Sequence, residues 1–289
     1  MNRNQGNLLT LIYSVFALVI TMIFFFPLFW FISLSLRRPI DTYTVNGFGI
    51  PWINFTPTLD NWIFQFQNPE LIKALLNTTT ISISATFLAL VIGLPAAYAL
   101  ARFRFYLPPN KDLTIWFLAL RALPPVALAV PFFVIFNMIG LFDTKLGMIV
   151  VITTFIMPFV IVIVRQTFID LPIELEEAAM VDGATHIGAF LKVAVPLSVP
   201  IIVASVVIMF SFAWNDYFFG LVLTIKNLIL PIHISRGIAA TSEWGTPFWF
   251  IDPKVVSVRS LIAMSLPVML ALLAQRYMFK ALALARRTL

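Results

Sequence analysis

The sequence predicts an all-α membrane protein with six transmembrane helices. Hydrophobic residues make up 61% of the 289 residues and charged residues only 11%, where a soluble protein carries about 25%. The mean hydropathy is +0.97, and long apolar runs alternate with short polar segments. Six spans of about 20 residues each would use roughly half of the chain. This composition excludes a soluble enzyme and a disordered chain.

Each apolar run in turn is long enough to cross a bilayer. The first is longer than the core of a signal peptide and ends in bulky residues, so we expect an uncleaved span with a kink at Pro27. The third contains Arg121 and the Pro124-Pro125 pair, which predicts a break near its start. We treat residues 1–289 as one transmembrane domain, with spans at about 8–36, 75–101, 113–139, 148–164, 195–223 and 255–279.

Six spans place both termini on the same side of the membrane. The loops on that side, together with the termini, carry ten Lys and Arg residues, and the opposite loops carry seven. This bias favours cytoplasmic termini. No Lys/Arg run exceeds two residues, so a nucleic-acid partner is not expected. Cysteine is absent, which excludes a disulfide framework.

The sequence offers no set of residues for catalysis, metal binding or ATP binding. In this topology its two histidines, His186 and His233, lie on opposite sides of the membrane and cannot share a metal. Gly183 and Gly188 have the spacing of a phosphate-binding loop, but Ala and Phe follow where Lys and Ser or Thr are required. Transport work by this chain would therefore need an ion gradient or a partner.

Residues 170–192, between the fourth and fifth spans, differ from their surroundings. Asp170 and Pro172 predict the start of a helix, Gly183 its end, and Asp182 or Thr185 the cap of a second helix. The segment is a short helix–turn–helix that either docks another protein or lies on its own bundle. It holds five of the 13 acidic residues, namely Asp170, Glu174, Glu176, Glu177 and Asp182.

The same segment resembles permease subunits of binding-protein-dependent ABC importers. Their motif is E-A-A, three residues, G, nine residues and I-x-L-P. Here it reads Glu177-Ala178-Ala179, Gly183 and Val193 to Pro196, with valine at both aliphatic positions. The tail from Lys280 departs from the Gly-rich tail of many relatives. Other residues resemble the carbohydrate branch of this family, and the resemblance is closest to the smaller permease of maltose-type importers. These residues are Asp182-Gly183-Ala184, Phe190, Pro200, Arg121 with the five residues after it, Trp214-Asn215-Asp216 and Gln275-Arg276-Tyr277.

The resemblance implies a type I ABC importer permease in a bacterial inner membrane. It implies a carbohydrate substrate, a second homologous permease, a soluble binding protein and two ATPase subunits that carry ATP and Mg. The chain itself would be no enzyme and would bind no cofactor. Residues 172–190 would be the coupling helix, seated in a cleft of an ATPase subunit. The implied coupling residues are Glu177, Ala178, Ala179, Asp182, Gly183, Phe190 and Pro196.

A second candidate site is the sequence Trp214-Asn215-Asp216-Tyr217 in the fifth span. Aromatic faces with amide and carboxylate groups suit a carbohydrate path, to which Arg121 could contribute. The alternative is a structural cluster in which Asp216 pairs with Arg121 or Arg259. An ion-gradient-driven transporter, the alternative function, would need carboxylates within spans, and only Asp216 qualifies.

The outer loops, 37–72 and 225–254, would face the binding protein. Their aromatic residues are either contacts for that protein or members of an interfacial belt. Asn77 to Thr80 are expected to cap the second span. The aromatic candidates are Trp62, Trp244, Phe248 and Trp249.

Overall fold

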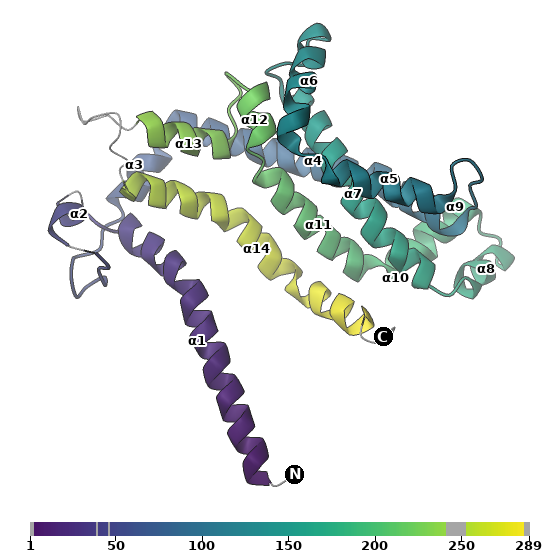
Figure 1. Cartoon of the computed structure of the whole chain (residues 1–289), viewed down its shortest axis with the longest axis horizontal. Helices are drawn as coiled ribbons and strands as arrows, with labels where there is room; N and C mark the ends of the chain where they lie inside the picture. The colour runs from purple at the N-terminus through teal and green to yellow at the C-terminus, as the bar shows by residue number, and fades with distance from the viewer. Residues whose placement is uncertain (1–2, 39, 46, 241–252, 286–289) are drawn as a thin grey trace. The chain divides into compact units, whose positions relative to one another are not determined.

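The computed structural model describes residues 3–38, 40–45, 47–240 and 253–285 (Figure 1). The elements within these ranges are helices, which confirms the all-α class. The chain forms two compact units, which are described separately. One unit is Met1–Leu71 with Ile234–Met264, and the other is Ile72–His233 with Ser265–Leu289.

The helices divide between the units as follows. The first unit contains α1 (Arg3–Ser35), α2 (Asp41–Thr44) and α3 (Asp60–Phe66). Three helices belong partly to each unit, namely α4 (Pro69–Arg102), α13 (Leu230–Ala240) and α14 (Pro253–Ala285). The second unit contains α5 (Asn110–Ala122), α6 (Pro125–Met138), α7 (Lys145–Asp170), α8 (Glu174–Val181), α9 (His186–Ala189), the π-helical turn η1 (Phe190–Ala194), α10 (Val195–Leu197), α11 (Val199–Trp214) and α12 (Phe218–Leu223).

Four described helices are long and apolar enough to cross a membrane. The number rises to six if two bent pairs each form one span, in agreement with the predicted number. One pair is α5 with α6, separated at Leu123 and Pro124, where proline removes a backbone donor. The other joins His186–Leu197 to Val199–Trp214 with a bend of 77°. The four continuous candidates are Leu11–Ser35, Pro69–Arg102, Lys145–Asp170 and Pro253–Tyr277.

The second span begins earlier than its hydropathy predicts. The Asn68 side chain accepts the backbone N–H groups of Glu70 and Leu71, at 2.9 and 3.2 Å, and so caps α4. Residues 77–80 therefore lie inside the helix, and the prediction that they cap it is wrong. A polar cap with an acidic first turn extended the helix beyond the apolar run.

Three other boundaries also differ from those predicted. The fifth span ends at Trp214 and α12 is a separate helix, whereas the apolar pattern continued to 223. Helix α14 continues to Ala285, into the residues expected to form a tail. Helix α13 replaces part of the expected loop 225–254, because Pro231 stands in its first turn, where a missing N–H costs little.

Small residues form the contact between α4 and α7. Ala85, Ala89 and Ala97 are fully buried and lie on one face of α4 together with Gly93. A Cβ at Gly93 would stand 2.8 Å from Cγ1 of the buried Val160 in α7. Such four-residue spacing of small side chains lets membrane helices approach closely. The two helices that lead to the polar segment 170–192 are therefore packed tightly together.

Candidate functional site

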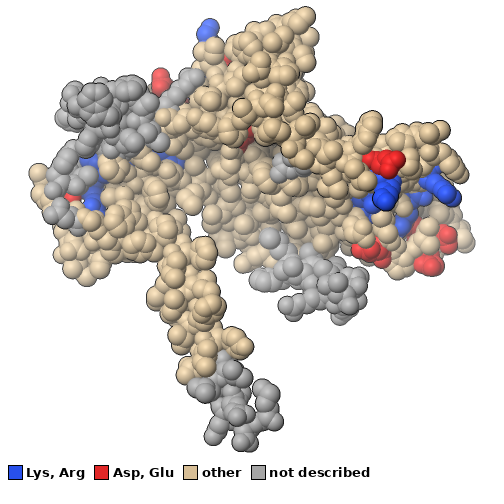
Figure 2. Space-filling model, viewed as in Figure 1, with Lys and Arg blue, Asp and Glu red and all other residues tan. Residues whose placement is uncertain are grey.

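Helix α8 carries two adjacent glutamates in different environments. Neighbouring residues of a helix point about 100° apart, so a short surface helix buries only one of them. Glu176 is buried, with 3% of its surface exposed, and Glu177 is exposed. Figure 2 shows acidic and basic side chains gathered at the end of the second unit that carries α8 and α9. The exposed Glu177 belongs to this charged end of the unit.

Glu176 attaches α8 to the end of α4. Its Oε1 accepts from Nη2 and Nε of Arg102, at 2.8 and 3.0 Å, and its Oε2 accepts from the Tyr98 hydroxyl at 2.6 Å. Nη2 of Arg102 also donates to the carbonyl oxygen of Leu171 at 3.0 Å. Two side chains of one helix thus satisfy both oxygens of the carboxylate. Both Arg102 bonds end on Oε1, and hydrogen bonds between charged groups are about twice as strong as those between neutral groups.

Phe190 provides a second attachment, just after α9. Its ring centroid lies 4.8 Å from that of Tyr98 and 6.2 Å from that of Phe168 in α7. Tyr98 and Phe168 are themselves 5.6 Å apart, edge to face. Tyr98 therefore contacts both attachments, through its hydroxyl and through its ring. Phe190 faces inward, unlike most of the other predicted coupling residues.

The outward surface of α8 and the following turn is built from small and acidic residues. Glu177, Ala178, Asp182 and Gly183 are exposed, and Ala179 is half-buried. Gly183 has a φ of 91°, and a Cβ there would meet nothing within 4 Å. Glycine is needed at this position for its backbone conformation and not for space within the chain.

The turn after Gly183 and the entry to α11 complete the segment. The Thr185 hydroxyl accepts the N–H of Gly188 at 3.1 Å and so caps α9. Pro196 lies in α10, next to the 77° bend. The structure thus brings six of the seven predicted coupling residues into one helix–turn–helix, with Pro196 after it.

The inward contacts of this segment were not predicted from the sequence. The only local signal is the pair Glu176-Glu177 on a short helix, of which one member must turn inward. Nothing in the spacing identifies Arg102, which is 74 residues away in the chain. Nor does the sequence identify the aromatic partner Tyr98, because it lies within an apolar span.

The residues from Trp214 to Tyr217 lie at the break between α11 and α12. Trp214 is 1% exposed and stacks on Phe210 at 5.6 Å, whereas Asn215 and Tyr217 are exposed. A carboxylate oxygen of Asp216 accepts the N–H of Gly220 at 3.0 Å, in the first turn of α12. This contact gives Asp216 a structural role at the helix end.

The two arginines considered as partners of Asp216 are placed differently. The side chain of Arg121 lies outside the described residues, and its backbone belongs to α5. Arg259 belongs to the first unit, where its Nε donates to Oε1 of Gln65 at 2.8 Å. Both side chains of this pair are buried.

The segment after α12 is held by polar side chains from two other elements. A carboxylate oxygen of Asp143 accepts the N–H groups of Ile225, Lys226 and Asn227, at 2.9 to 3.1 Å. Burial alone would raise the pKa of the Asp143 carboxyl, but these N–H donors outweigh it and lower the pKa below its usual value. No motif in the sequence identifies Asp143.

Residues predicted to cap α4 contribute to the same arrangement. The Asn77 amide donates to the carbonyl oxygen of Leu228 at 3.1 Å, and the Thr78 hydroxyl accepts the N–H of Leu230 at 2.7 Å. The loop between α12 and α13 is therefore fixed at both ends, by the α6–α7 loop and by α4.

We expect replacement of Asp143 by Asn to weaken this loop and remove part of the pH dependence of stability. A folded-state pKa below about 3.9 means that the stabilisation is complete above that pH and is lost as pH falls through the lowered pKa. At neutral pH the loss should be about 1 kcal/mol, given the screening at this half-exposed site. Thermal unfolding between pH 3 and 7 would measure it. An unchanged acid profile in the variant would contradict this role.

Among the aromatic candidates of the outer loops, Trp62 lies in α3. Its Nε1 donates to the Ser35 hydroxyl at 3.2 Å, and its ring stacks on Phe66. It therefore serves packing within the first unit. Trp244, Phe248 and Trp249 lie outside the described residues.

Comparisons with known proteins agree with this architecture. The trehalose transport system permease protein SugB of Mycobacterium tuberculosis is 39% identical over 213 residues, which cover 73% of this chain and 75% of SugB. The sulfoquinovosyl glycerol transport system permease protein SmoH of Agrobacterium fabrum is 32% identical and covers 68% of this chain and 67% of SmoH. In the crystal structure of a bacterial ABC transporter that imports the acidic polysaccharide alginate, one chain matches with a TM-score of 0.78 at 18% identity, over 96% of this chain and 99% of that one.

The match to the alginate transporter confirms the fold of a type I ABC importer permease. A family model described as binding-protein-dependent transport system inner membrane component matches residues 89–283. That range includes the whole of the coupling segment and the break between α11 and α12. This family match leaves no support for an ion-gradient-driven secondary transporter. The chain therefore belongs to the family of inner membrane components of binding-protein-dependent transport systems.

Proposed function

We propose that this chain is a permease subunit of an ATP-driven importer of a carbohydrate. Trehalose, sulfoquinovosyl glycerol and alginate, named for the relatives and the matching structure, are all sugars, glycosides or their polymers. In this proposal the chain forms the translocation path with a second homologous permease and receives its substrate from a soluble binding protein. Two cytoplasmic ATPase subunits bind ATP and Mg and carry out hydrolysis. Both termini of the chain are then cytoplasmic.

The observation that carries this proposal is the construction of α8 and its turn. The outward face offers Glu177 for pairing with a basic residue, and Ala178 and Ala179 where a partner surface must approach closely. The inward face is fixed to α4 through Glu176. A displacement of α8 by the closing ATPase subunits would therefore pass to the spans and not be absorbed in a loose loop.

The path of this displacement follows from the contacts. Arg102 and Tyr98 receive it at the end of α4, and Phe190 carries it to α7 through Phe168. Because α4 and α7 are packed along small residues, the two helices would move together. Alternating access then corresponds to a shift between two packed arrangements that ATP binding favours differently.

For the substrate path, we propose fewer sugar-contacting residues than the sequence suggested. Asn215 and Tyr217 are exposed at the α11–α12 break and would contact a sugar there, although the Asn215 amide also donates to the carbonyl oxygen of Ser211 at 2.9 Å. Asp216 positions the start of α12 next to them. The ring of Trp214 is buried and would support this site from the interior of the fold. Arg121 would contribute to this path from α5.

The function is tested by purifying the full-length chain with its co-expressed neighbours and reconstituting the complex in liposomes. We expect ATP hydrolysis that is stimulated by the loaded binding protein and uptake of a labelled sugar. Uptake that continues after removal of every ATPase subunit would overturn the proposal. Stimulation only by non-carbohydrate substrates would overturn its sugar assignment alone.

We expect Gly183→Val to uncouple ATP hydrolysis from transport. A β-branched residue resists the left-handed conformation at a cost of about 1–2 kcal/mol, so the turn after α8 would change direction. Gly183→Asn is the matched control, since Asn tolerates positive φ, and it should retain most of the transport rate. The measurement is the ratio of sugar transported to ATP hydrolysed. A wild-type ratio for the Val variant would refute the assigned role of this turn.

A further inference from the structure

A tight loop, residues 47–55, follows α1 in the first unit and holds a tryptophan in a strained conformation. Trp52 has a φ of 63°, in the left-handed region that bulky residues rarely adopt. The backbone N–H of Trp52 donates to the carbonyl oxygen of Phe55 at 2.9 Å. The N–H of Ile50 donates to Oδ1 of Asn54 at 2.8 Å, which closes the loop from the other side. Strain of this kind persists only where the surrounding structure enforces it.

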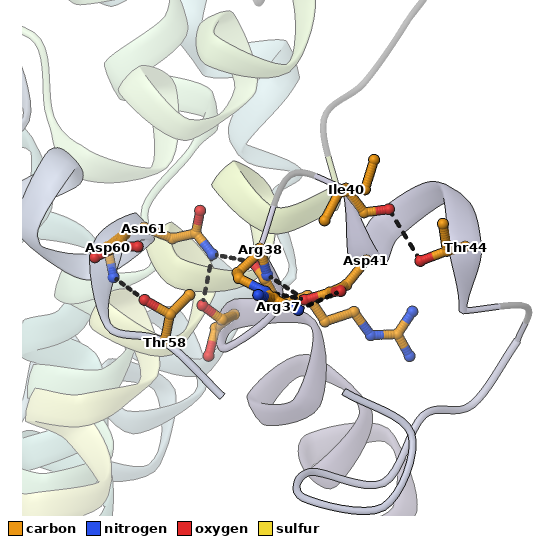
Figure 3. Close-up of polar contacts among 9 residues, drawn as sticks. Arg37, Arg38, Ile40, Asp41, Thr44, Thr58, Asp60 and Asn61 are labelled. Atoms are coloured by element: carbon orange, nitrogen blue, oxygen red, sulfur yellow. Dashed lines mark hydrogen bonds and ion pairs between the residues drawn. The ribbon is translucent and has the colours of Figure 1, made fainter. Parts of the chain in front are cut away.

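The base of the loop is anchored by a buried arginine. Arg37 is 2% exposed, and its two Nη atoms donate to the carbonyl oxygens of Val45 and Gly47, at 3.3 and 3.0 Å. The guanidinium also lies over the ring of Phe55, 5.4 Å from its centroid. Figure 3 shows the adjacent contacts, including the Asn61 amide that donates to the carbonyl oxygen of Arg37 at 2.7 Å. The loop is thus tied to the chain directly after α1.

The loop also packs back along the side of α1. The ring of Phe48 lies 5.3 Å from that of Phe26 and 5.5 Å from that of Trp30. Phe26 is nine residues before Ser35, the end of the helix, which is about 14 Å along the axis. The apolar stretch Leu11–Ser35 has 25 residues and is about 38 Å long, against about 30 Å of hydrocarbon in a bilayer. Phe48 therefore holds the loop against the last three turns of the span, at the boundary between the hydrocarbon and the headgroups.

The composition and exposure of the loop fit that depth. Residues 42–59 contain no Lys, Arg, Asp or Glu. Trp52 is 82% exposed, Ile53 76% and Ile50 41%. Next to Phe26, Phe25 and Phe29 line an apolar groove on α1.

We propose that the loop 47–55 is an interfacial anchor that inserts Trp52 and Ile53 into the headgroup region of the bilayer beside α1. Tryptophan favours this region because its ring is apolar and its N–H can still bond to water or lipid. We assign the surface to lipid and not to a partner protein, because Phe48 ties the loop to the outermost turns of a span. The anchor fixes the height of α1 in the membrane. This inference depends on α1 as a span and is independent of the proposed substrate and coupling residues.

The chain contains no cysteine, so a single spin label can be placed at will. Trp52→Cys and Ile53→Cys are labelled with a nitroxide in the full-length chain, assembled with its co-purified partners in nanodiscs of phosphatidylcholine and phosphatidylglycerol. Collision of the label with oxygen, which enters lipid, is compared with collision with a water-soluble nickel chelate. Asp60→Cys, an exposed charged position at the start of α3, is the matched control.

We expect the oxygen-to-nickel ratio at 52 and 53 to be at least about threefold higher than at 60, as for side chains at the membrane interface. Ratios at both positions equal to that at 60 would overturn the proposal. Labels shielded from both reagents would also overturn it, because they would show that a protein covers the loop. The Ile53 label keeps the test valid if the Trp52 variant relaxes the turn.

Discussion

Glu176→Gln is expected to lower the free energy of unfolding of the chain by about 3 kcal/mol. The carboxylate pairs with Arg102, and the exposed fractions of the two side chains are 4% and 11%. An amide in its place leaves the guanidinium without a counter-charge. An amide also has only one acceptor oxygen, so it cannot accept from Arg102 and Tyr98 through separate oxygens as the carboxylate does. Breaking one member of a buried pair is much more costly than removing an exposed one. Thermal unfolding of the reconstituted chain would measure the loss.

Glu177, the next residue, offers a control in which the same side chain points outward and not inward. Glu177→Gln changes the same group one residue along the helix, and because Glu177 is exposed its effect on stability should stay within about 0.5 kcal/mol. Its effect should appear in the complex, as a reduced stimulation of ATP hydrolysis by substrate. Equal loss of stability in both variants would show that Glu176 does not anchor α8.

The contrast between these glutamates shows what could be predicted from the sequence. The number of spans follows from local hydropathy, and the turn at Gly183 follows from local glycine chemistry, so both were predictable. The choice between Glu176 and Glu177 depends on a partner 74 residues away, whose position is decided only when α4 and α7 pack. A motif can mark the segment, but it cannot say which carboxylate faces inward.

The break between α11 and α12 illustrates a second limit. The apolar pattern runs through it, and a continuous span to 223 was therefore predicted. The structure ends the helix at Trp214, where a carboxylate oxygen of Asp216 starts a new helix by accepting the N–H of Gly220. Hydropathy measures transfer to lipid and is insensitive to a polar side chain that competes for backbone donors. For the same reason hydropathy does not identify Asp143, although three backbone N–H groups converge on it.

Gly147→Ala is expected to lower the free energy of unfolding by about 3 kcal/mol. A Cβ at this position would clash with the carbonyl oxygen of Leu141, a backbone atom that cannot rotate away. Relief would require α7 to separate from the loop that precedes it. That loop contains Asp143, so the segment after α12 should loosen as well. Thermal unfolding and proteolysis near residues 224–228 would report the two effects.

Gly188→Ala provides a control that is matched in local structure. Each glycine lies in the first turn of its helix, and each donates its N–H to a capping threonine hydroxyl, Thr144 for Gly147 and Thr185 for Gly188. A Cβ at Gly188 would meet the Cβ of Ala184 at 3.3 Å, which needs only a small adjustment. Because alanine also favours the helix by up to about 1 kcal/mol, the net change should be close to zero. A similar loss at both positions would mean that the cost at Gly147 arises from the helix turn itself and not from the contact with Leu141.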